Sequence, residues 1–378
     1  MVRVLILGAG FGGLELASTL AAEAHGAVEV VLIDRTEGFV FGFSKLDVMF
    51  GRATADHVMH PYADLAHPGV RFVAATVESI DPGARSVVTT AGTFEADVLV
   101  VALGADLDPA ATPGLLEHGH EFYTEEGAFR LREVLADFPG GDVVVAVTST
   151  PFKCPPAPSE TALLVHDHLR ERGLLDSSSV SLVMPLPVPI PPSPAASRAL
   201  LAQFERRGIA WHPGALVRSV EPGRVVLAGG GALPFDLLLA VPVHRAPEVV
   251  VEAGLTEDGW VAVDPGTLQT RFEDVYAVGD VTSVGTPKAG VFAEGQAAVV
   301  AAQLIARSRG EDSGAAYDGR GTCYLEFGDG LVGKVDVTFL RGLAPTGALQ
   351  GPSIELAADK AVFGIDRVRR WFGREWTP

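Results

Sequence analysis

The stretch VRVLILGAGFGG, residues 2–13, decides the fold of this 378-residue chain. Val2–Leu7 is an apolar run of the kind that forms a buried strand. The glycine-rich turn GAGFGG follows it, and a helical pattern continues over Leu14–Glu23. A strand, a glycine turn and a helix in this order are typical of the first unit of a dinucleotide-binding domain.

Three glycines of this turn have separate tasks. Gly8 permits the tight turn, Gly10 lets the backbone approach a pyrophosphate, and Gly13 allows close packing of the helix. The helix N-terminus adds the positive end of its dipole. Together with Phe11, these glycines are candidate cofactor-binding residues.

An acidic residue follows at the expected distance from the glycines. A second strand, Val28–Ile33, ends at Asp34, about 20 residues further on, where a carboxylate can accept both ribose hydroxyls of NAD or FAD. The same carboxylate disfavours a 2′-phosphate. Arg35 and Val77 are added to the candidate cofactor-binding residues of this half.

Two later segments decide between NAD and FAD. A strand over Asp97–Leu103 runs into Gly104, and the segment from Thr270 gives a strand that ends in Gly279-Asp280. An acidic residue at the carboxyl end of a strand, beside the glycine turn, is well placed to bind the ribityl chain of a flavin. These segments match the ATG-like and GD motifs of flavoproteins with two dinucleotide-binding domains, which resemble glutathione reductase in fold. The resemblance implies an α/β protein with FAD as its cofactor.

The motifs divide the chain into three parts. Residues 1–104 and 246–310 are predicted to form the FAD-binding domain, and residues 105–245 an inserted, degenerate NAD-like Rossmann domain. Residues 311–378 add a small α+β segment, in which Gly321–Phe327 and Val332–Phe339 are expected to be antiparallel strands.

The second domain lacks the features that bind a nucleotide. Between the strand Asp142–Val147 and the helical pattern Ser159–Arg172, the turn at residues 148–158 reads TSTPFKCPPAP and contains no glycine. The next strand, Val180–Met184, runs into a proline-rich segment that has no acid for a ribose. Proline gives a stiff, extended chain without amide donors. We therefore expect NAD(P)H to be a poor reductant for this protein.

A lysine stands before the next expected helix, which opens near Pro287 and continues to about Arg307. The helix N-terminus would direct its dipole at the pyrimidine ring of a flavin, and Lys288, beside Ala289, would add positive charge. The alternative for Lys288 is an ordinary solvated surface lysine.

Composition excludes several classes of function. The formal net charge of -18 at pH 7 argues against nucleic acid or anionic lipid as a partner of the whole surface. No apolar run approaches the ~20 residues that span a bilayer, and the first residues do not resemble a secretion signal. We therefore expect a cytoplasmic protein. Its two cysteines, Cys154 and Cys323, are either unrelated thiols or a redox pair that the fold brings together.

Three motifs give a more specific resemblance. KCPPAPSE at residues 153–160, PKAGVFAE at 287–294 and TCY at 322–324 resemble the sulfide-oxidising flavoproteins, which are the sulfide:quinone oxidoreductases and the flavoprotein subunit of flavocytochrome c sulfide dehydrogenase. The match covers nearly the whole chain.

The resemblance implies functional residues and substrates. Cys154 and Cys323 would form a redox-active disulfide beside the flavin, Glu160 would transfer protons, and a quinone would accept the electrons. Many quinone reductases of the family have a third, earlier cysteine that this chain lacks, which leaves the handling of a polysulfide product open. Because both cysteines are assigned to the redox pair, we expect FAD to be held non-covalently.

The expected chemistry begins with hydrosulfide or a small thiol. It attacks one sulfur of the disulfide and leaves a persulfide and a thiolate, and the thiolate nearest the flavin reduces it by two electrons. We assign Cys323 to the flavin side and the persulfide to Cys154. Lys153 would lower the pKa of Cys154 if its ammonium turns inward; otherwise it faces solvent.

Three histidines complete the polar candidates. His244 lies where the chain returns to the FAD domain and is either structural or a proton shuttle, with the structural role favoured. His166 and His168 stand two residues apart, on different faces of a helix, so we expect no metal site.

The last segment, Ala358–Trp376, combines apolar and aromatic residues with arginines. This pattern predicts either an interfacial helix on the inner face of the cell membrane, which would reach quinone, or an amphipathic helix packed on the body or on another subunit, so that a homodimer stays open.

Two rival functions stay open. One is a type II NADH:quinone oxidoreductase, which shares the fold; the glycine-free second turn and the paired cysteines speak against it. The other is a flavin-bound redox sensor whose disulfide switches a partner interface.

Overall fold

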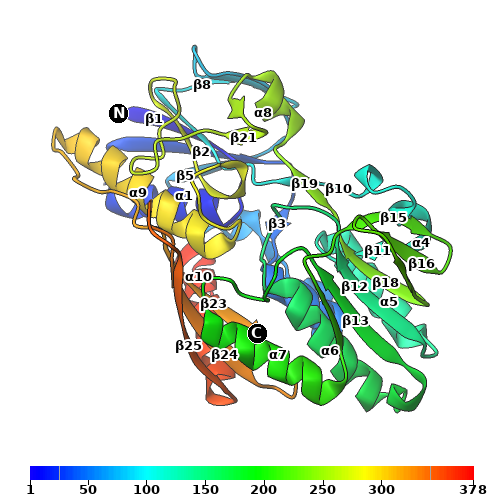
Figure 1. Cartoon of the computed structure of the whole chain (residues 1–378). Coiled ribbons are helices and arrows are strands. Elements are labelled where there is room, and N and C mark those ends of the chain that lie inside the picture. Colours follow the sequence, from blue (N-terminus) through cyan, green and yellow to red (C-terminus); the bar gives the residue numbers. More distant parts are fainter. Residues whose placement is uncertain (25, 341) are drawn as a thin grey trace.

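A five-stranded parallel sheet carries the N-terminal glycine turn. In the computed structural model, which describes residues 1–24, 26–340 and 342–378, its strand order is β22-β9-β1-β2-β5. The strands are β1 (Val2–Leu7), β2 (Val28–Asp34), β5 (Val70–Ala74), β9 (Val98–Val101) and β22 (Val275–Ala277). Two segments far apart in sequence thus share one sheet, the upper lobe in Figure 1.

Both faces of this sheet are covered. Side chains alternate along a strand, so Val4 and Ile6 of β1 pack with α1 (Phe11–Glu23) and α9 (Gly290–Arg309), whereas Leu5 and Leu7 pack beneath a small antiparallel sheet and α8. The small sheet consists of β6 (Val77–Asp81), β7 (Ser86–Thr89) and β8 (Gly92–Glu95), and α8 spans Glu248–Glu252.

A second parallel sheet forms the other lobe. Its order is β11-β18-β12-β13-β14. The strands are β11 (His120–Glu121), β12 (Asp142–Val147), β13 (Ser179–Met184), β14 (Ala210–Pro213) and β18 (Leu237–Val241). One face packs on α5 (Glu125–Asp137), α6 (Ala157–Glu171) and α7 (Pro194–Arg207). The other faces α4 (Leu115–His118) and the antiparallel strands β15 (Val217–Glu221), β16 (Arg224–Leu227) and β17 (Ala232–Pro234).

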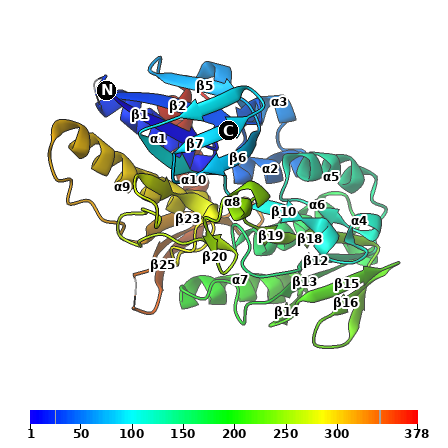
Figure 2. The same cartoon turned by 90° about the horizontal axis from the view of Figure 1, so that it is seen from above.

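Two antiparallel strands join the lobes. β10 (Asp106–Asp108) leaves the first lobe and β19 (Val243–Arg245) returns to it, and Figure 2 shows both between the lobes. Shorter elements are β3 (Gly38–Phe39), α2 (Gly42–Met49), α3 (Ala55–Val58), β4 (His60–Pro61), β20 (Thr256–Glu257) and β21 (Trp260–Val261).

The C-terminal segment is an antiparallel sheet followed by one helix. β23 (Arg320–Glu326), β24 (Val332–Thr338) and β25 (Thr346–Ser353) pair in that order, and α10 spans Glu355–Phe372. This sheet lies against α6 and α7 of the second lobe (Figure 1). The predicted α/β fold with two Rossmann-type units is confirmed, while the boundaries at residues 104, 245 and 310 stay predictions.

The last helix packs on the body. Val368, Trp371, Phe372 and Trp376 are buried in the core of the first lobe, so these aromatics of the expected membrane segment are core residues. Val362, in contrast, is 49% exposed. Among the residues that the structure describes, no helix is long and apolar enough to cross a bilayer.

Candidate active site

A pocket of about 410 Å³ lies where the two lobes and the C-terminal segment meet. Ten of the predicted site residues line it: Gly10, Phe11, Gly104, Cys154, Glu160, Gly279, Asp280, Lys288, Ala289 and Cys323. The other five, Gly8, Gly13, Asp34, Arg35 and Val77, lie outside its lining. The fold therefore brings together residues that are up to 313 positions apart in the sequence, from Gly10 to Cys323.

The fold requires glycine at two positions of this turn, and at a third it leaves space for a side chain. Gly8 has a φ of +100°, and a Cβ there would collide with the carbonyl oxygen of Ala102. A Cβ on Gly13 would collide with the carbonyl oxygen of Gly8. A Cβ on Gly10 would meet nothing within 4 Å. Only Gly10 therefore keeps space clear at the start of α1, which fits the close approach of a pyrophosphate.

Asp34 braces this turn. One of its oxygens accepts a hydrogen bond from the N–H of Ala9 at 2.7 Å, and the other accepts from the N–H and the hydroxyl of Thr36, at 2.8 and 2.7 Å. The oxygen that accepts from Ala9 has a second lone pair, so it can still accept a ribose hydroxyl, whereas the other already accepts two hydrogen bonds. Arg35 is largely exposed and lies 3.6 Å from Asp106, and Val77 pairs with Thr89 in the small sheet.

Lys288 is a buried cation and not a solvated one, so the surface alternative is wrong. It is 7% exposed, and its ammonium donates to the carbonyl oxygens of Asp280 at 2.5 Å and Thr282 at 3.3 Å. The same nitrogen lies 3.2 Å from the centre of the Trp260 ring. Burial lowers the pKa of Lys288 to about 8, and Asp280 opposes the shift. Burial likewise raises the pKa of Asp280, while Lys153 and Lys288 oppose it.

The second-lobe turn holds Cys154 in a rare backbone conformation. Cys154 has a φ of +48°, which non-glycine residues seldom adopt and which is frequent at functional sites. Its N–H donates to the carbonyl oxygen of Lys288 at 2.7 Å, and its own carbonyl oxygen accepts from Ala157 at 2.9 Å, where α6 begins. The turn around Cys154 is therefore hydrogen-bonded directly to the backbone of Lys288 in the first lobe.

His244 also holds the turn around Cys154 in place. It is 5% exposed; one ring nitrogen lies 2.9 Å from the carbonyl oxygen of Pro242, and the other accepts the backbone N–H of Lys153 at 3.2 Å. This pattern assigns the proton to Nδ1 of a neutral ring. Burial, with Lys153 nearby, lowers the pKa of His244 to about 3. His244 is therefore structural, and the proton-shuttle alternative is wrong.

The two cysteines line the pocket as separate thiols, Cys154 exposed to it and Cys323 half-buried. Although Cys154 opens to the pocket, protein surrounds its other sides, so burial raises its pKa, and Glu160 and Cys323 raise it further. Burial and Glu160 raise the pKa of Cys323 to about 12. Lys153 does not turn toward Cys154: its ammonium donates to the carbonyl oxygen of Ala105 at 3.2 Å. The expected lowering of the Cys154 pKa is therefore not found.

Glu160 contacts a charge network in which Glu326 and Lys360 are mostly buried and Arg52 is partly exposed. One of its oxygens accepts the backbone N–H of Glu326 at 2.9 Å. The Glu326 carboxylate accepts two hydrogen bonds from Arg52, at 2.6 and 3.1 Å, and one from Lys360. Arg52 also pairs with Asp47 at 2.8 Å. Our sequence analysis missed this network, because its partners are brought together only by the fold.

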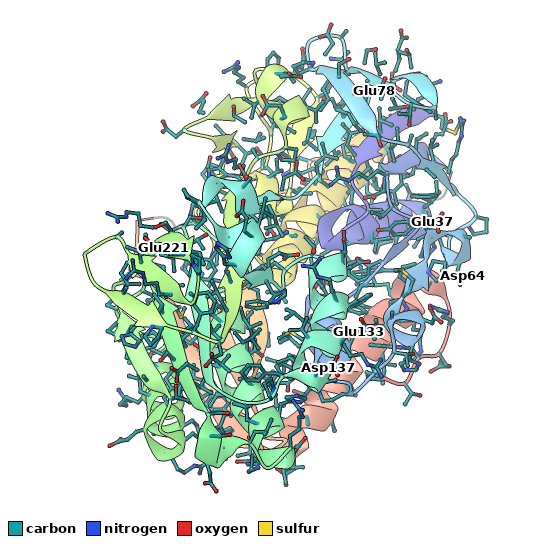
Figure 3. All side chains as sticks on the ribbon, turned by 90° about the vertical axis from the view of Figure 1, so that its right-hand side faces the viewer. Glu37, Asp64, Glu78, Glu133, Asp137 and Glu221 are labelled. Atoms are coloured by element: carbon teal, nitrogen blue, oxygen red, sulfur yellow. The ribbon has the colours of Figure 1, made fainter. Side chains whose placement is uncertain are left out.

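Lysine distribution was the signal that could have pointed to the pocket. Lysine occurs at only five positions, and all but Lys334 line this pocket: Lys45, Lys153, Lys288 and Lys360. Figure 3 shows six of the 47 acidic residues along one side of both lobes, Glu37, Asp64, Glu78, Glu133, Asp137 and Glu221. A cationic pocket in an acidic protein attracts small anions.

The proline-rich segment after β13 is packed against the rest of the chain. Ser197 donates to the carbonyl oxygen of Ile190 at 2.8 Å and accepts its N–H at 3.0 Å, which pins the proline segment to α7. A Cβ on Gly347 of β25 would lie 2.9 Å from the Cβ of Ser193 and 3.1 Å from the carbonyl oxygen of Pro192. The C-terminal sheet therefore packs directly on the end of the proline segment.

The two helix histidines have different neighbours. His168 lies 3.2 Å from the carbonyl oxygen of Leu135, and His166 lies 3.8 Å from Asp167. Within the described ranges, no group of three or more His, Cys, Asp or Glu residues could hold a metal ion.

Comparison with known proteins adds independent information. A family profile described as pyridine nucleotide-disulphide oxidoreductase matches residues 2–303. The chain is 27% identical to the sulfide-quinone reductase of Aquifex aeolicus over 356 residues, which cover 86% of this chain and 81% of that protein. It is 32% identical to alternative NAD(P)H-ubiquinone oxidoreductase C1 of Arabidopsis thaliana over 203 residues, which cover 47% of this chain but 38% of that protein.

A solved structure has the same fold. The X-ray structure of the sulfide:quinone oxidoreductase from Aquifex aeolicus matches with a TM-score of 0.86 at 22% identity, and the match covers 99% of this chain and 93% of that chain.

Proposed function

The chain belongs to the pyridine nucleotide-disulphide oxidoreductase family, and from this premise we propose that it is an FAD-dependent enzyme that oxidises sulfide, or a related thiol or persulfide, and passes the electrons to a quinone. The matches confirm the resemblance to the sulfide:quinone oxidoreductases that the motifs indicated. The observation that carries the proposal is that Cys154 and Cys323, which are the only cysteines of the chain, line one pocket together with the GD-motif residues Gly279 and Asp280.

The cofactor site is proposed along the first sheet. Gly10 and the α1 N-terminus would bind the pyrophosphate of FAD, Asp34 the ribose, and the Asp280 segment the ribityl chain. Gly8 and Gly13 hold the turn in shape, so they support the site without lining it. When bound, FAD supplies the two-electron acceptor next to the cysteine pair.

The cysteines would carry the sulfur chemistry. In the oxidised pair, a hydrosulfide ion forms a new S–S bond to Cys154 and breaks the bond to Cys323, whose sulfur leaves as a thiolate with the electron pair. Cys154 suits the persulfide role because it is exposed to the pocket, whereas Cys323 is half-buried.

Quinone access is proposed beside α10. Phe43, Tyr324 and Phe363 line the pocket on this side, and Ile354 and Val362 of the C-terminal segment are 68% and 49% exposed. An apolar surface next to an aromatic-lined pocket suits peripheral contact with a membrane, from which a quinone would enter.

The second candidate is an NADH:quinone oxidoreductase, which the similarity to the Arabidopsis enzyme favours. The packed proline segment and the glycine-free turn count against it, because prolines supply no amide donors and the N–H groups of Lys153 and Cys154 already donate within the protein.

An anaerobic stopped-flow experiment distinguishes the two candidates. The FAD absorption band is followed after mixing with sulfide or with NADH, in the wild type and in Cys154→Ser, with Ser149→Ala as the matched control in the same turn. We expect sulfide to bleach the band rapidly in the wild type and the control but not in Cys154→Ser. Bleaching by NADH that is unaffected by the cysteine substitution would overturn the proposal.

A further inference from the structure

We infer that Glu326 is a positioning residue for Glu160: by holding Lys360 and Arg52, it keeps both cations from pairing with the Glu160 carboxyl, which can then carry a proton beside the cysteines. The role of this proton in sulfide oxidation rests on the proposed function, whereas the arrangement of the charged side chains around Glu160 does not depend on it.

The network beneath the cysteines has balanced charges before Glu160 is counted. Two cations, Arg52 and Lys360, face two carboxylates, Asp47 and Glu326, and three ion pairs join them. Glu160 is a third carboxyl group, 5% exposed, and it forms no ion pair with any described residue. Its contact with Glu326 is to the backbone N–H at 2.9 Å. Ionisation of Glu160 would therefore leave an uncompensated buried negative charge, which is costly.

The side chain of Glu326 is well fixed. Two nitrogens of Arg52 donate to the two oxygens of its carboxylate, and Lys360 donates to the same carboxylate. Such paired, charge-assisted hydrogen bonds are strong and geometrically specific. Lys360 comes from α10 and Arg52 from the segment after α2, so Glu326 holds two distant parts of the chain together next to Glu160, which lines the pocket.

The electrostatic directions agree with this arrangement. Burial alone would raise the pKa of Glu326, but Lys360 and Arg52 lower it to about 2. Burial raises the pKa of Glu160 to about 7; Glu326 adds to the rise, whereas Lys360 and Arg52 only partly oppose it.

Three further ionisable groups lie near Glu160. Burial raises the pKa of Cys154, Cys323 and Tyr123, and the charge of Glu160 adds to each shift. A neutral Glu160 would not repel an incoming hydrosulfide ion or a new thiolate.

Infrared titration of the intact protein with FAD bound tests the inference without sulfide turnover. The carbonyl stretching band of protonated Glu160, identified by its loss in Glu160→Gln, is followed against pH. Glu326→Gln keeps the backbone N–H but removes the charge, so it frees Lys360 and Arg52 to face Glu160, and we expect the titration midpoint to fall by roughly 1 unit or more. Lys360→Met removes a cation, and we expect the midpoint to rise.

Asp329→Asn is the matched control, because Asp329 is a carboxylate just beyond β23 that pairs with Arg170 and Arg207, away from the pocket. The titration midpoint of Glu160 in Asp329→Asn should equal that in the wild type. An unchanged or raised midpoint in Glu326→Gln, or a fall of equal size in Asp329→Asn, would overturn the inference. If Glu326→Gln does not fold, the direction of the Lys360→Met shift decides.

The pH profile of FAD reduction by sulfide gives a second readout. It should move in the same direction as the infrared midpoint in each variant. If sulfide reduces none of the proteins while the infrared midpoints move as expected, the positioning role holds and the proposed function fails.

Discussion

Substitution of two glycines in one turn separates cofactor binding from folding. Gly10 has a φ of -76° and a ψ of -165°, which alanine adopts freely, and its added Cβ meets nothing within 4 Å. Loss of glycine at the helix N-cap costs up to about 1 kcal/mol, and the stiffer unfolded chain returns about 0.4–1 kcal/mol. We therefore expect Gly10→Ala to change the free energy of unfolding by less than about 1 kcal/mol.

Gly8→Ala should behave in the opposite way. A φ of +100° costs an alanine about 1–3 kcal/mol, and its Cβ would also collide with the Ala102 carbonyl oxygen, which belongs to the backbone and cannot move aside easily. Together with the overpacking cost of about 1–3 kcal/mol, the expected loss is about 2–6 kcal/mol.

The assays are urea denaturation of the cofactor-free proteins and titration with FAD. Because a methyl group on Gly10 would fill the approach to the pyrophosphate, we expect FAD affinity to fall at least about tenfold, equivalent to ~1.4 kcal/mol, at nearly unchanged stability. Wild-type FAD affinity in Gly10→Ala, or a loss of stability as large as in Gly8→Ala, would refute this account of the turn.

Three further predictions concern buried side chains. Trp371 is fully buried and donates to Glu15 at 3.1 Å, so Trp371→Ala should lose roughly 3–5 kcal/mol of unfolding free energy in urea, and Trp371→Phe clearly less; equal losses would contradict the packing argument. Burial raises the Glu160 pKa from 4.5 to about 7, so between these pH values the native state retains a proton that the unfolded chain releases. The free energy of unfolding of the wild type should therefore fall by on the order of 3 kcal/mol, relative to that of Glu160→Gln, as pH rises through this window. Parallel curves of unfolding free energy against pH would rule this out. The pKa of His244 is lowered from 6.5 to about 3, which gives the opposite pH dependence: its contribution to stability is complete above pH 6.5 and is lost as pH falls toward 3. The unfolding free energy of His244→Gln should therefore fall less in acid than that of the wild type, by several kcal/mol. An equal loss in both proteins would show that His244 is not held neutral.

Local patterns were sufficient to predict the scaffold. The apolar run before Gly8 became β1, the turn expected at residues 148–158 follows β12 and includes the first two residues of α6, and the two expected C-terminal strands pair antiparallel. These elements depend on residues that are neighbours in sequence, so periodicity and glycine placement are enough.

Contacts between distant segments could not be predicted in this way. Arg52 meets Glu326 across 274 residues, and the Glu160 side chain reaches the Glu326 backbone across 166. Nothing in the local sequence distinguishes these charged residues from solvated ones. Only the shortage of lysine in the chain, which the sequence analysis did not use, could have pointed to Lys360.

The C-terminal helix shows a different limit. One apolar face with arginines around it is expected both for a helix on a membrane and for a helix packed on a protein. The structure buries Trp371 and Phe372 in the first lobe and leaves Val362 exposed, so one face of α10 packs on the body, while membrane contact of the other face stays a proposal.

The most direct test of the central claim is to locate the sulfur after one turnover. The oxidised protein with FAD bound is mixed anaerobically with sulfide, quenched in acid with an alkylating agent, and digested for mass spectrometry of the two cysteine peptides. The account predicts one added sulfur atom on Cys154, a plain alkylated thiol on Cys323, and neither product in protein that was not exposed to sulfide. FAD reduction by sulfide with no added sulfur on either cysteine would contradict it.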